Sequence, residues 1–497
     1  MTIDELDTEP PTRVIPAPPV STEPPKHTVL LPRVSTDPLD ELVDRIRPAL
    51  VRAVDALQVA AALEADGFTD RVARVEYGFS DVFGLAAEVF HRLGPPAEAA
   101  PRSVPAGPGR RGIRLLAHGP LYVLPAAVFP AVLGVLGQRS VVLALTVASA
   151  IGWMSAGTVA YGAYRLLGSY RPRAAARLLR ACTLAAPPAG AAVGLAVVGV
   201  AGGGWGLVVL AAGQLAYQLA GTVLMFYRRE GIQAAAMAPA VLAGCGYLLA
   251  GAALRPAALI TAAAGVAAAF AGALWVTRGH GDRAEPSARP LLRAEVPNLA
   301  WVTGYGFCSA ALLLHAEAPY LLSRLDVAVA VAPLIASMGF VEWRAESFRG
   351  DAVRLTRHSH SPAEFGRHIW IMVGRETVAC LAVPALLGLA LLAVLGGTGR
   401  LTGAAALMTA AHVVLGGAYY LAFLLAGFER FGRLCASMLA AMAAHVGLGA
   451  WLGAAPLLGQ TSAPLTDTAL YLGSTLALLG LFLLGLRPIL GQVRHYQ

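Results

Sequence analysis

Four polar side chains lie inside long apolar stretches, where a polar group is costly and therefore informative. Gln214 and Gln218 are four residues apart and share one face of a helix. His412 and His445 lie near the middle of two later stretches. Since such groups face protein or water and not lipid, they predict a polar substrate path or a proton-sensitive site at the centre of a helix bundle. The alternative is hydrogen bonding between helices that fixes the packing, worth about 1 kcal/mol or less for each.

Charges of alternating sign gather where the eighth and ninth apolar stretches meet their connection. Glu342 and Arg344 stand at the end of the eighth stretch, followed by Glu346 and Arg349, and Arg375 begins the ninth. Ion pairs at the edge of a membrane can break and re-form between conformations. We therefore predict that Glu342, Arg344 and Arg375 form a cytoplasmic gate. The alternative is an ordinary solvated helix end.

The sequence lacks the common motifs of membrane enzymes. It contains no GxxxxGK[ST] phosphate loop, no HExxH and no GxSxG. The five cysteines are widely separated and show neither paired spacing nor a metal-ligand pattern. Asp326 and Asp467 are expected as carboxylates on the outer side, where every predicted loop is short, and Glu317 is expected with His315 at the membrane interface, at the outer end of the seventh span. We therefore expect no enzyme activity, no cofactor and no metal site.

Membrane helices must position these side chains, because the 497 residues are 57% hydrophobic and 14% charged. Twelve apolar stretches have about the length that a helix needs to cross a hydrocarbon core of roughly 30 Å. We expect an all-α polytopic membrane protein with about 12 transmembrane helices. The expected spans are 119–137, 141–164, 181–201, 204–226, 235–253, 256–276, 298–318, 327–343, 376–397, 402–425, 434–454 and 468–486.

Arginines alternate between the connections. Each connection after an even-numbered span carries several, whereas the connections between carry one or none. Because cytoplasmic loops retain positive charge, this alternation predicts a multi-pass protein of the cytoplasmic membrane with both termini in the cytoplasm. Topology and anionic headgroups account for the net charge of +8. The expected partners are therefore membrane lipids and not nucleic acid.

The residues before the first span divide into three segments. Residues 1–36 are rich in proline and lack periodicity, which predicts a disordered tail. Residues 37–94 show apolar residues at helical spacing after Asp37-Pro38, which predicts a small cytoplasmic helical element. Residues 95–112 are a proline-containing linker. Because an element of this size has a small core of its own, it could dock on the membrane domain or bind a cytoplasmic partner.

The spans fall into two groups of six, each with its longest internal connection after its second span. In the first group, Tyr161–Arg180 is predicted as an amphipathic cytoplasmic helix, and in the second, Glu342–Arg375 is predicted to contain a helix from Ser361. Equal halves of this kind favour duplication, whereas convergent loop lengths are the alternative. The expected parts are a first six-helix bundle at 113–276, a connection at 277–297, a second six-helix bundle at 298–488 and a cytoplasmic tail at 489–497.

This topology resembles the multidrug/oligosaccharidyl-lipid/polysaccharide flippase superfamily over about residues 113–488. Besides the topology, the resemblance rests on the segments Tyr161–Pro188 and Phe340–Pro384. It implies two six-helix bundles that move lipid-linked sugars or amphipathic cations by alternating access. In the lipid-linked-sugar branch, arginines inside the central cavity hold the diphosphate. This chain departs from that pattern, because its arginines lie at the ends of spans.

Two functions from different classes are therefore expected. The first is a transporter or flippase for an amphipathic or lipid-linked, glycan-related substrate, with Gln214, Gln218, His412 and His445 along its path. The second is a non-transporting membrane scaffold whose residues 37–94 recruit a cytoplasmic partner. A polar centre favours the transporter, whereas a centre filled by alanine, leucine and aromatic side chains favours the scaffold.

Overall fold

The structure is a computed structural model. It describes residues 37–50, 55–93, 110–136, 138–278, 288–321, 323–359, 361–453 and 463–492. The expected N-terminal tail, most of the linker and the last residues of the C-terminal tail lie outside these ranges. The described residues form helices and no strands. Two compact units, residues 1–106 and 107–497, are described separately below.

The N-terminal unit contains four short helices around its own apolar core: α1 (Pro38–Leu50), α2 (Ala56–Ala65), α3 (Asp70–Glu76) and α4 (Val82–Leu93). Leu42, Leu63 and Leu85 are fully buried in this core. Side chains cap the helix starts, as Asp55 does by accepting a hydrogen bond from the Gln58 amide at 2.8 Å. Arg92 ties the end of α4 to the start of α1 through Asp37, at 2.6 Å, and Asp40, at 2.8 Å.

The Arg92 contacts predict that acid weakens the N-terminal unit. The hydrogen bond from Arg92, with help from the Leu39 amide, lowers the pKa of Asp37 below its usual 3.8. A carboxyl group with a lowered folded-state pKa stabilises the fold above its unfolded pKa, and that contribution is lost as the pH falls through the folded value. Thermal melts of residues 37–93 should therefore show a midpoint that falls below about pH 4. Arg92→Gln should lower the midpoint at pH 7 and flatten its acid dependence, whereas Arg71→Gln should leave both unchanged.

The membrane unit consists of long apolar helices. Eleven helical segments among the described residues are long and apolar enough to cross a membrane. One of them, Glu230–Val276, contains two helices that pack side by side, so the fifth and sixth expected spans fall within it. The protein is therefore an all-α, multi-pass membrane protein. Its principal helices are α8 (Gln138–Gly168), α9 (Pro172–Ala201), α10 (Trp205–Phe226), α11 (Glu230–Ala250), α12 (Arg255–Val276), α14 (Val296–Glu317), α16 (Ala332–His358), α17 (Pro362–Gly397), α18 (Gly403–Gly427), α19 (Phe431–Trp451) and α20 (Pro464–Leu490).

The first apolar segment is broken into short helices. They are α5 (Arg110–Leu116), α6 (His118–Val123), the 3₁₀ turn η1 (Leu124–Ala127) and α7 (Phe129–Leu136). Pro120, Pro125 and Pro130 fall within these pieces, and a proline removes a backbone donor that a continuous helix would use. Short helices also occur elsewhere, at α13 (Arg289–Ala294), α15 (Leu325–Ala328), the 3₁₀ turn η2 (Gly251–Leu254) and the 3₁₀ turn η3 (Val329–Val331).

The structure contradicts one of the two helices predicted in the long connections and confirms the other. The expected helix at Tyr161–Arg180 is wrong, because a turn at Tyr170 and Arg171 divides this stretch between the end of α8 and the start of α9. The helix expected from Ser361 is confirmed, and it continues without a break through the ninth span as α17. Ser361 caps this helix by accepting a hydrogen bond from the Glu364 amide at 3.2 Å.

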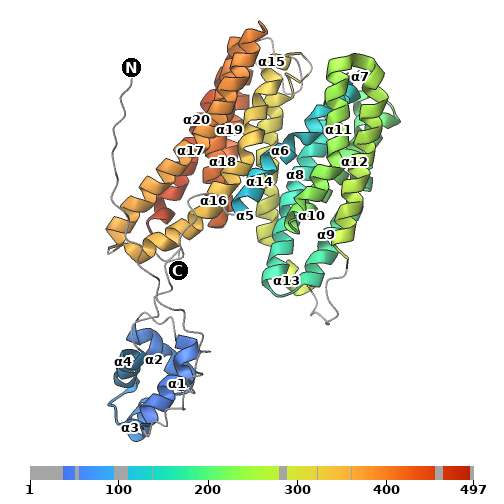
Figure 1. The fold of residues 1–497 in the computed structure, drawn as a ribbon. Coiled ribbons are helices and arrows are strands. Elements are labelled where there is room, and N and C mark those ends of the chain that lie inside the picture. Colours follow the sequence, from blue (N-terminus) through green and yellow to red (C-terminus); the bar gives the residue numbers. More distant parts are fainter. Residues whose placement is uncertain are drawn as a thin grey trace, which may run out of the picture. The chain divides into compact units, whose positions relative to one another are not determined.

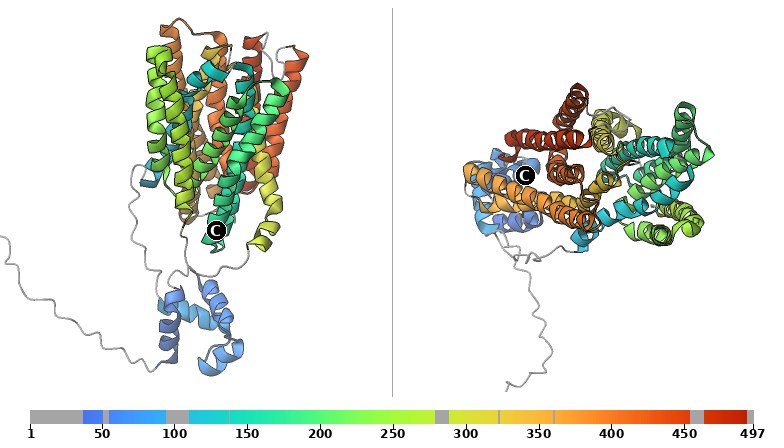
Figure 2. Two further views of the ribbon diagram at one scale, coloured as in Figure 1. Left: turned by 90° about the vertical axis from the view of Figure 1, so that its right-hand side faces the viewer. Right: turned by 90° about the horizontal axis from the view of Figure 1, so that it is seen from above.

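The helices pack in two groups, each with its own buried cluster. The α8–α12 group and the α16–α20 group are separate in Figure 1, and Figure 2 shows them end-on. In the first group α8 packs on α9 and α10, α9 on α10, α10 on α12, and α11 on α12. In the second, α16 packs on α17 and α18, α17 on α18, α18 on α20, and α19 on α20. The order of pairing is therefore the same in both groups.

Similar turns follow the corresponding helices α10 and α18, and the same turn also follows α8, where Tyr170 has a φ of 57°. Arg228 follows α10 and Glu429 follows α18, and both residues have a φ of 57°. In the first turn the Arg229 amide donates to the carbonyl of Leu224 at 2.7 Å. In the second the Arg430 amide donates to Leu425 at 2.9 Å. The two turns thus share their backbone geometry and an arginine at the same position.

Three helix pairs among the described residues join the groups, with α14 counted in the second because its buried residues belong to that cluster. The short helices α5 and α6 each pack on α16, and α8 packs on α14. The turns that connect α8 to α9, α10 to α11, and α18 to α19 carry arginine residues and lie at the end of the unit that is lower in Figure 1, as does the α16–α17 connection. We call this the arginine-rich end, and the other the opposite end.

Candidate functional site

Two buried histidines each face a buried carboxylate in the second group of helices. His412 on α18 places its Nε2 atom 3.1 Å from Oε1 of Glu317, in the last turn of α14. His445 on α19 places Nε2 3.5 Å from Oδ1 of Asp467, in the first turn of α20. All four side chains are at least 95% buried. We call these residues, together with Tyr320 and Tyr471, the His–carboxylate cluster.

Two tyrosines complete the cluster. The Tyr320 hydroxyl donates a hydrogen bond to Oδ2 of Asp467 at 2.5 Å. The Tyr471 ring stands edge-on to both imidazoles, with its centroid 5.8 Å from that of His412 and 5.6 Å from that of His445. His315 also lies edge-on to His445 at 5.5 Å. One continuous group of polar side chains therefore connects both histidine and carboxylate pairs.

The helix dipole favours a negative charge on only one of the two buried carboxylates. Asp467 lies near a helix N-terminus, where the dipole of the helix favours negative charge. Glu317 lies near a C-terminus, where the dipole opposes it. His412 is nine residues after the start of α18, or about 14 Å from the opposite end at 1.5 Å per residue. Glu317 is therefore stabilised by its histidine partner rather than by its helix.

The cluster leaves polar atoms without a protein hydrogen bond. Both Glu317 oxygens, both ring nitrogens of His412 and Oδ1 of Asp467 have none among the described residues, although the ion-pair distances are short. A buried carboxylate without hydrogen bonds is costly as an anion and readily takes up a proton. Imidazole and carboxylate groups are the side chains that most often exchange protons in proteins. The cluster therefore brings together the groups that a proton pathway needs.

Residues next to the cluster hold together the helix ends that carry it. Tyr320 follows α14, and its burial beside Asp467 raises the pKa of the hydroxyl, so that it stays a hydrogen-bond donor. Its carbonyl accepts a hydrogen bond from the Arg324 amide at 3.0 Å. The Arg324 guanidinium in turn holds Asp326 at 3.0 and 3.1 Å, and the Thr402 hydroxyl donates to Asp326 at 2.6 Å. These contacts fasten the segment that carries Tyr320 to the start of α18.

The predicted path residues belong to two separate sets of contacts. Gln214 donates a hydrogen bond to the Ser149 hydroxyl at 3.1 Å, between α10 and α8. Gln218 lies against Gly152 of α8, in the same interface. His412 and His445 lie in the His–carboxylate cluster. The structure thus brings the two histidines together around Tyr471, but the glutamines pack within the first group.

The predicted gate residues also separate. Glu376, which is 4% exposed, accepts hydrogen bonds from Arg344 at 2.5 Å and from Arg375 at 2.9 and 3.1 Å. Arg344 and Arg375 therefore meet around a shared carboxylate that joins α16 to α17. Glu342 faces another direction, toward His118 and Tyr122 of α6.

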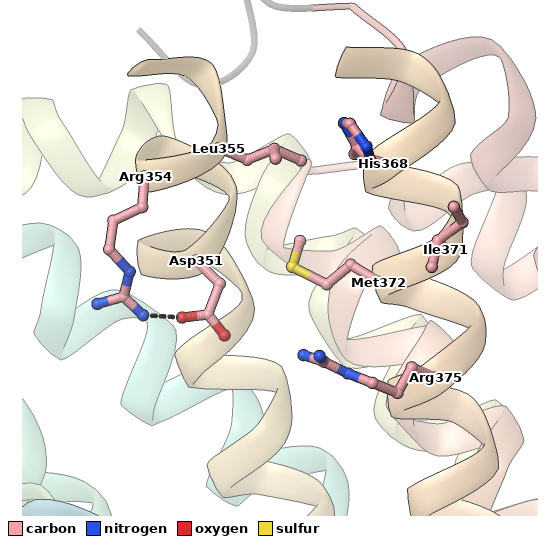
Figure 3. A pocket seen from close by; sticks show the side chains of 7 residues that line it. All are labelled: Asp351, Arg354, Leu355, His368, Ile371, Met372 and Arg375. Atoms are coloured by element: carbon pink, nitrogen blue, oxygen red, sulfur yellow. Dashed lines mark hydrogen bonds and ion pairs between the residues drawn. The ribbon is translucent and has the colours of Figure 1, made fainter. Parts of the chain in front are cut away.

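A pocket of about 440 Å³ opens between α16 and α17 near the arginine-rich end. Figure 3 shows Leu355 and Met372 pointing into the space between the helices and Arg375 reaching across it, whereas Arg354 turns aside to its ion-pair partner Asp351. Because carboxylates pair with both arginines, the pocket is nearly balanced in charge. It does not have the concentrated positive charge of an anion site.

Sequence reasoning did not anticipate the burial of the two carboxylates. Glu317 was expected at the outer end of its span and Asp467 in an outer loop, but they are 5% and 3% exposed and lie within helices. Asp467 lies in a helix that begins before the expected span, at Pro464, which hydropathy alone does not mark. The spacing of Asp467 and Tyr471, one helical turn apart, was an available signal.

Comparisons of the chain with family models, with curated proteins and with solved structures find no match. The class of protein therefore comes from the fold and its apolar helices. The protein is a multi-pass α-helical membrane protein with ionisable residues buried among its helices.

Proposed function

We propose that this protein is a proton-coupled transporter or flippase for an amphipathic or lipid-linked, glycan-related substrate. The His–carboxylate cluster is the observation that carries the proposal. Ionisable residues within membrane helices are expensive, and they commonly mark ion or proton pathways. Here four such residues form two adjacent pairs, which is more than helix packing requires. The glycan-related substrate rests on the resemblance to the flippase superfamily.

The pairing of helices supports two similar halves. We infer twelve spans, with α11 and α12 counted separately, in two bundles of six that are related by duplication. Five principal pairings recur in the same order, and equivalent turns follow α10 and α18. Two halves that meet through few helix pairs can rock against each other, as transporters with internal repeats do.

The correspondence between halves also supports a concentration of the proposed chemistry in the second half. Phe428 in the turn after α18 is equivalent to Tyr227 in the turn after α10, so the two halves can be aligned on these residues. In this alignment Ala211 stands at the position of His412, and Gly244 stands at the position of His445. The first half therefore has small side chains where the second has imidazoles, which supports one proton-binding half.

A transport assay tests this proposal. The purified protein would be reconstituted in phosphatidylcholine vesicles with either a fluorescent phospholipid or a fluorescent polyprenyl-diphosphate sugar. An imposed pH gradient should accelerate movement of one probe across the bilayer, and reversing the gradient should reverse the preferred direction. Movement equal to that in protein-free vesicles for both probes, or movement that ignores the gradient, would contradict proton-coupled transport.

Labelling tests the proposed orientation, in which the arginine-rich end is cytoplasmic. In a cysteine-free background, single cysteines at Gly203 and Arg400 should react in intact cells with an impermeant thiol reagent. Cysteines at Arg173 and Gln492 should react only after permeabilisation. Reaction of the Arg173→Cys variant in intact cells would place the arginine-rich end outside the cell and contradict the proposed orientation.

The scaffold remains a second candidate because of the N-terminal unit. That unit has its own core and exposes large apolar side chains, with Leu57 at 66%, Val75 at 77% and Phe83 at 56%. Exposed apolar side chains of this size are candidates for contact with a partner. Deletion of residues 1–101 should then remove a protein partner from the purified complex, and neither the full-length nor the shortened protein should move either probe across the vesicle membrane.

A further inference from the structure

Two sets of polar contacts tie the two groups of helices together. In the first, Glu342 on α16 accepts a hydrogen bond from the Tyr122 hydroxyl at 2.9 Å and lies 2.7 Å from Nδ1 of His118. The other ring nitrogen of His118 is 3.6 Å from Glu230 at the start of α11. This set therefore connects α6 both to α11 in the first group and to α16 in the second.

The second set lies between α8 and the start of α14. Glu295 accepts hydrogen bonds from Arg165 Nε at 2.8 Å and from the Tyr161 hydroxyl at 3.2 Å. Asn298 donates to the same carboxylate at 2.9 Å. These donors lower the pKa of Glu295, with the Asn298 hydrogen bond as the largest cause, so the carboxylate stays ionised at neutral pH.

His118 and two of the carboxylates in these sets are buried, whereas the donors Tyr122 and Arg165 are 40% and 47% exposed. His118 and Glu230 are each 8% exposed, and Glu295 is 5% exposed. Partly buried ion pairs are screened less by salt than exposed ones. A Cβ atom at Gly119 would come within 2.0 Å of the Ala336 carbonyl oxygen, so α6 and α16 touch through their backbones. The polar contacts thus join helices whose backbones are already closely packed.

Each set lies in the half of the membrane unit near the arginine-rich end. Tyr161 and Arg165 are in the last two turns of α8, which ends there, and Glu295 precedes α14, which begins there. The Thr158 and Thr303 hydroxyls, 2.7 Å apart, lie farther along the same α8–α14 interface. The polar contacts between the groups that the described residues show all belong to this half.

We propose that these two sets form a latch that holds the arginine-rich end closed, and that both must break before that end opens. The inference rests on the two-half transporter proposed above. The sets occupy the two largest helix contacts that join the groups, α6 with α16 and α8 with α14. Release of one set leaves the other as a restraint, so opening is cooperative. The structure is then the conformation closed at the arginine-rich end.

Chemical access to a cysteine at position 303 tests the latch without a transport assay. Thr303 lies at the α8–α14 interface and should react with N-ethylmaleimide only in the open conformation. The modification rate of T303C in the purified full-length protein would be followed by mass spectrometry of the peptide that carries it. We expect E295Q and E342Q each to raise the rate about threefold to tenfold, and the double variant to raise it further.

The matched control is D326N, which removes an ion pair at the opposite end that does not cross between the groups. It should leave the rate of T303C unchanged. A second measurement is disulfide formation in T158C/T303C, which should be rapid in the native background and slower with E295Q and E342Q together. Unchanged rates in both latch variants, or an equal rise with D326N, would overturn the latch. If E295Q and E342Q raise the modification rate as expected but the protein moves neither lipid probe in vesicles, the latch stands and the proposed transport function does not.

Discussion

Replacement of Glu317 by glutamine is expected to reduce proton-driven transport about 100-fold, the scale of loss typical when a proton-transferring side chain is removed. Glutamine keeps nearly the same shape and stays within reach of His412, whose Nε2 lies 3.1 Å from the carboxylate. It cannot gain or lose a proton in the physiological range. The rate of probe movement would be measured in vesicles with and without a pH gradient.

The glutamine variant should fold as well as the unmodified protein, because it removes a buried negative charge at a helix C-terminus. His412→Gln should produce the same loss of gradient dependence. Glu346→Gln, on the exposed side of α16, is the matched control and should transport normally. A Glu317→Gln protein that still responds fully to the gradient would remove Glu317 from the proton pathway.

The second large effect is expected at Gly190, where α9 and α10 touch through their backbones. A Cβ atom at this position would lie 2.4 Å from the Ala211 carbonyl oxygen and 2.7 Å from the Ala212 Cα. Small residues allow such close approach between membrane helices, and overpacking typically costs about 1–3 kcal/mol or more. Gly190→Ala should therefore lower the melting temperature of the detergent-solubilised protein markedly.

Gly213→Ala provides the comparison within the same helix pair. Its Cβ would meet no atom within 4 Å, and alanine favours a helix over glycine by about 1 kcal/mol. This variant should melt at the same temperature or slightly higher. Equal melting temperatures for the two variants would show that the α9–α10 contact is looser than the structure indicates.

Much of the helical architecture could be predicted because membrane spans are defined by length and hydropathy. The fifth and sixth expected spans merge into one apolar segment because only the short η2 turn separates them. The turn at Tyr170 was missed, since a non-glycine residue with positive φ leaves no reliable mark in the sequence. The break in the first span was signalled by its prolines, which hydropathy ignores.

The candidate site was only partly predictable. His412 and His445 stood out because they are polar residues in apolar surroundings. Their partners Glu317 and Asp467 did not, because each lies near the end of a helix, where a carboxylate usually meets water. Only the packing of α14, α18, α19 and α20 against one another buries them. Likewise, Glu342 and Arg344 were predicted to belong to one gate. Residues two apart on a helix face different neighbours, and these two side chains contact different helices.

The repeated order of helix pairing bears on how such a chain could originate. If each half crosses the membrane six times, as we propose, it begins and ends on the same side, so both halves insert in the same orientation about an axis along the membrane normal. A single half of that kind could pair with its own copy as a symmetric dimer. In such a dimer the two copies are identical, so Ala211 and Gly244 opposite His412 and His445 require two copies that have changed independently.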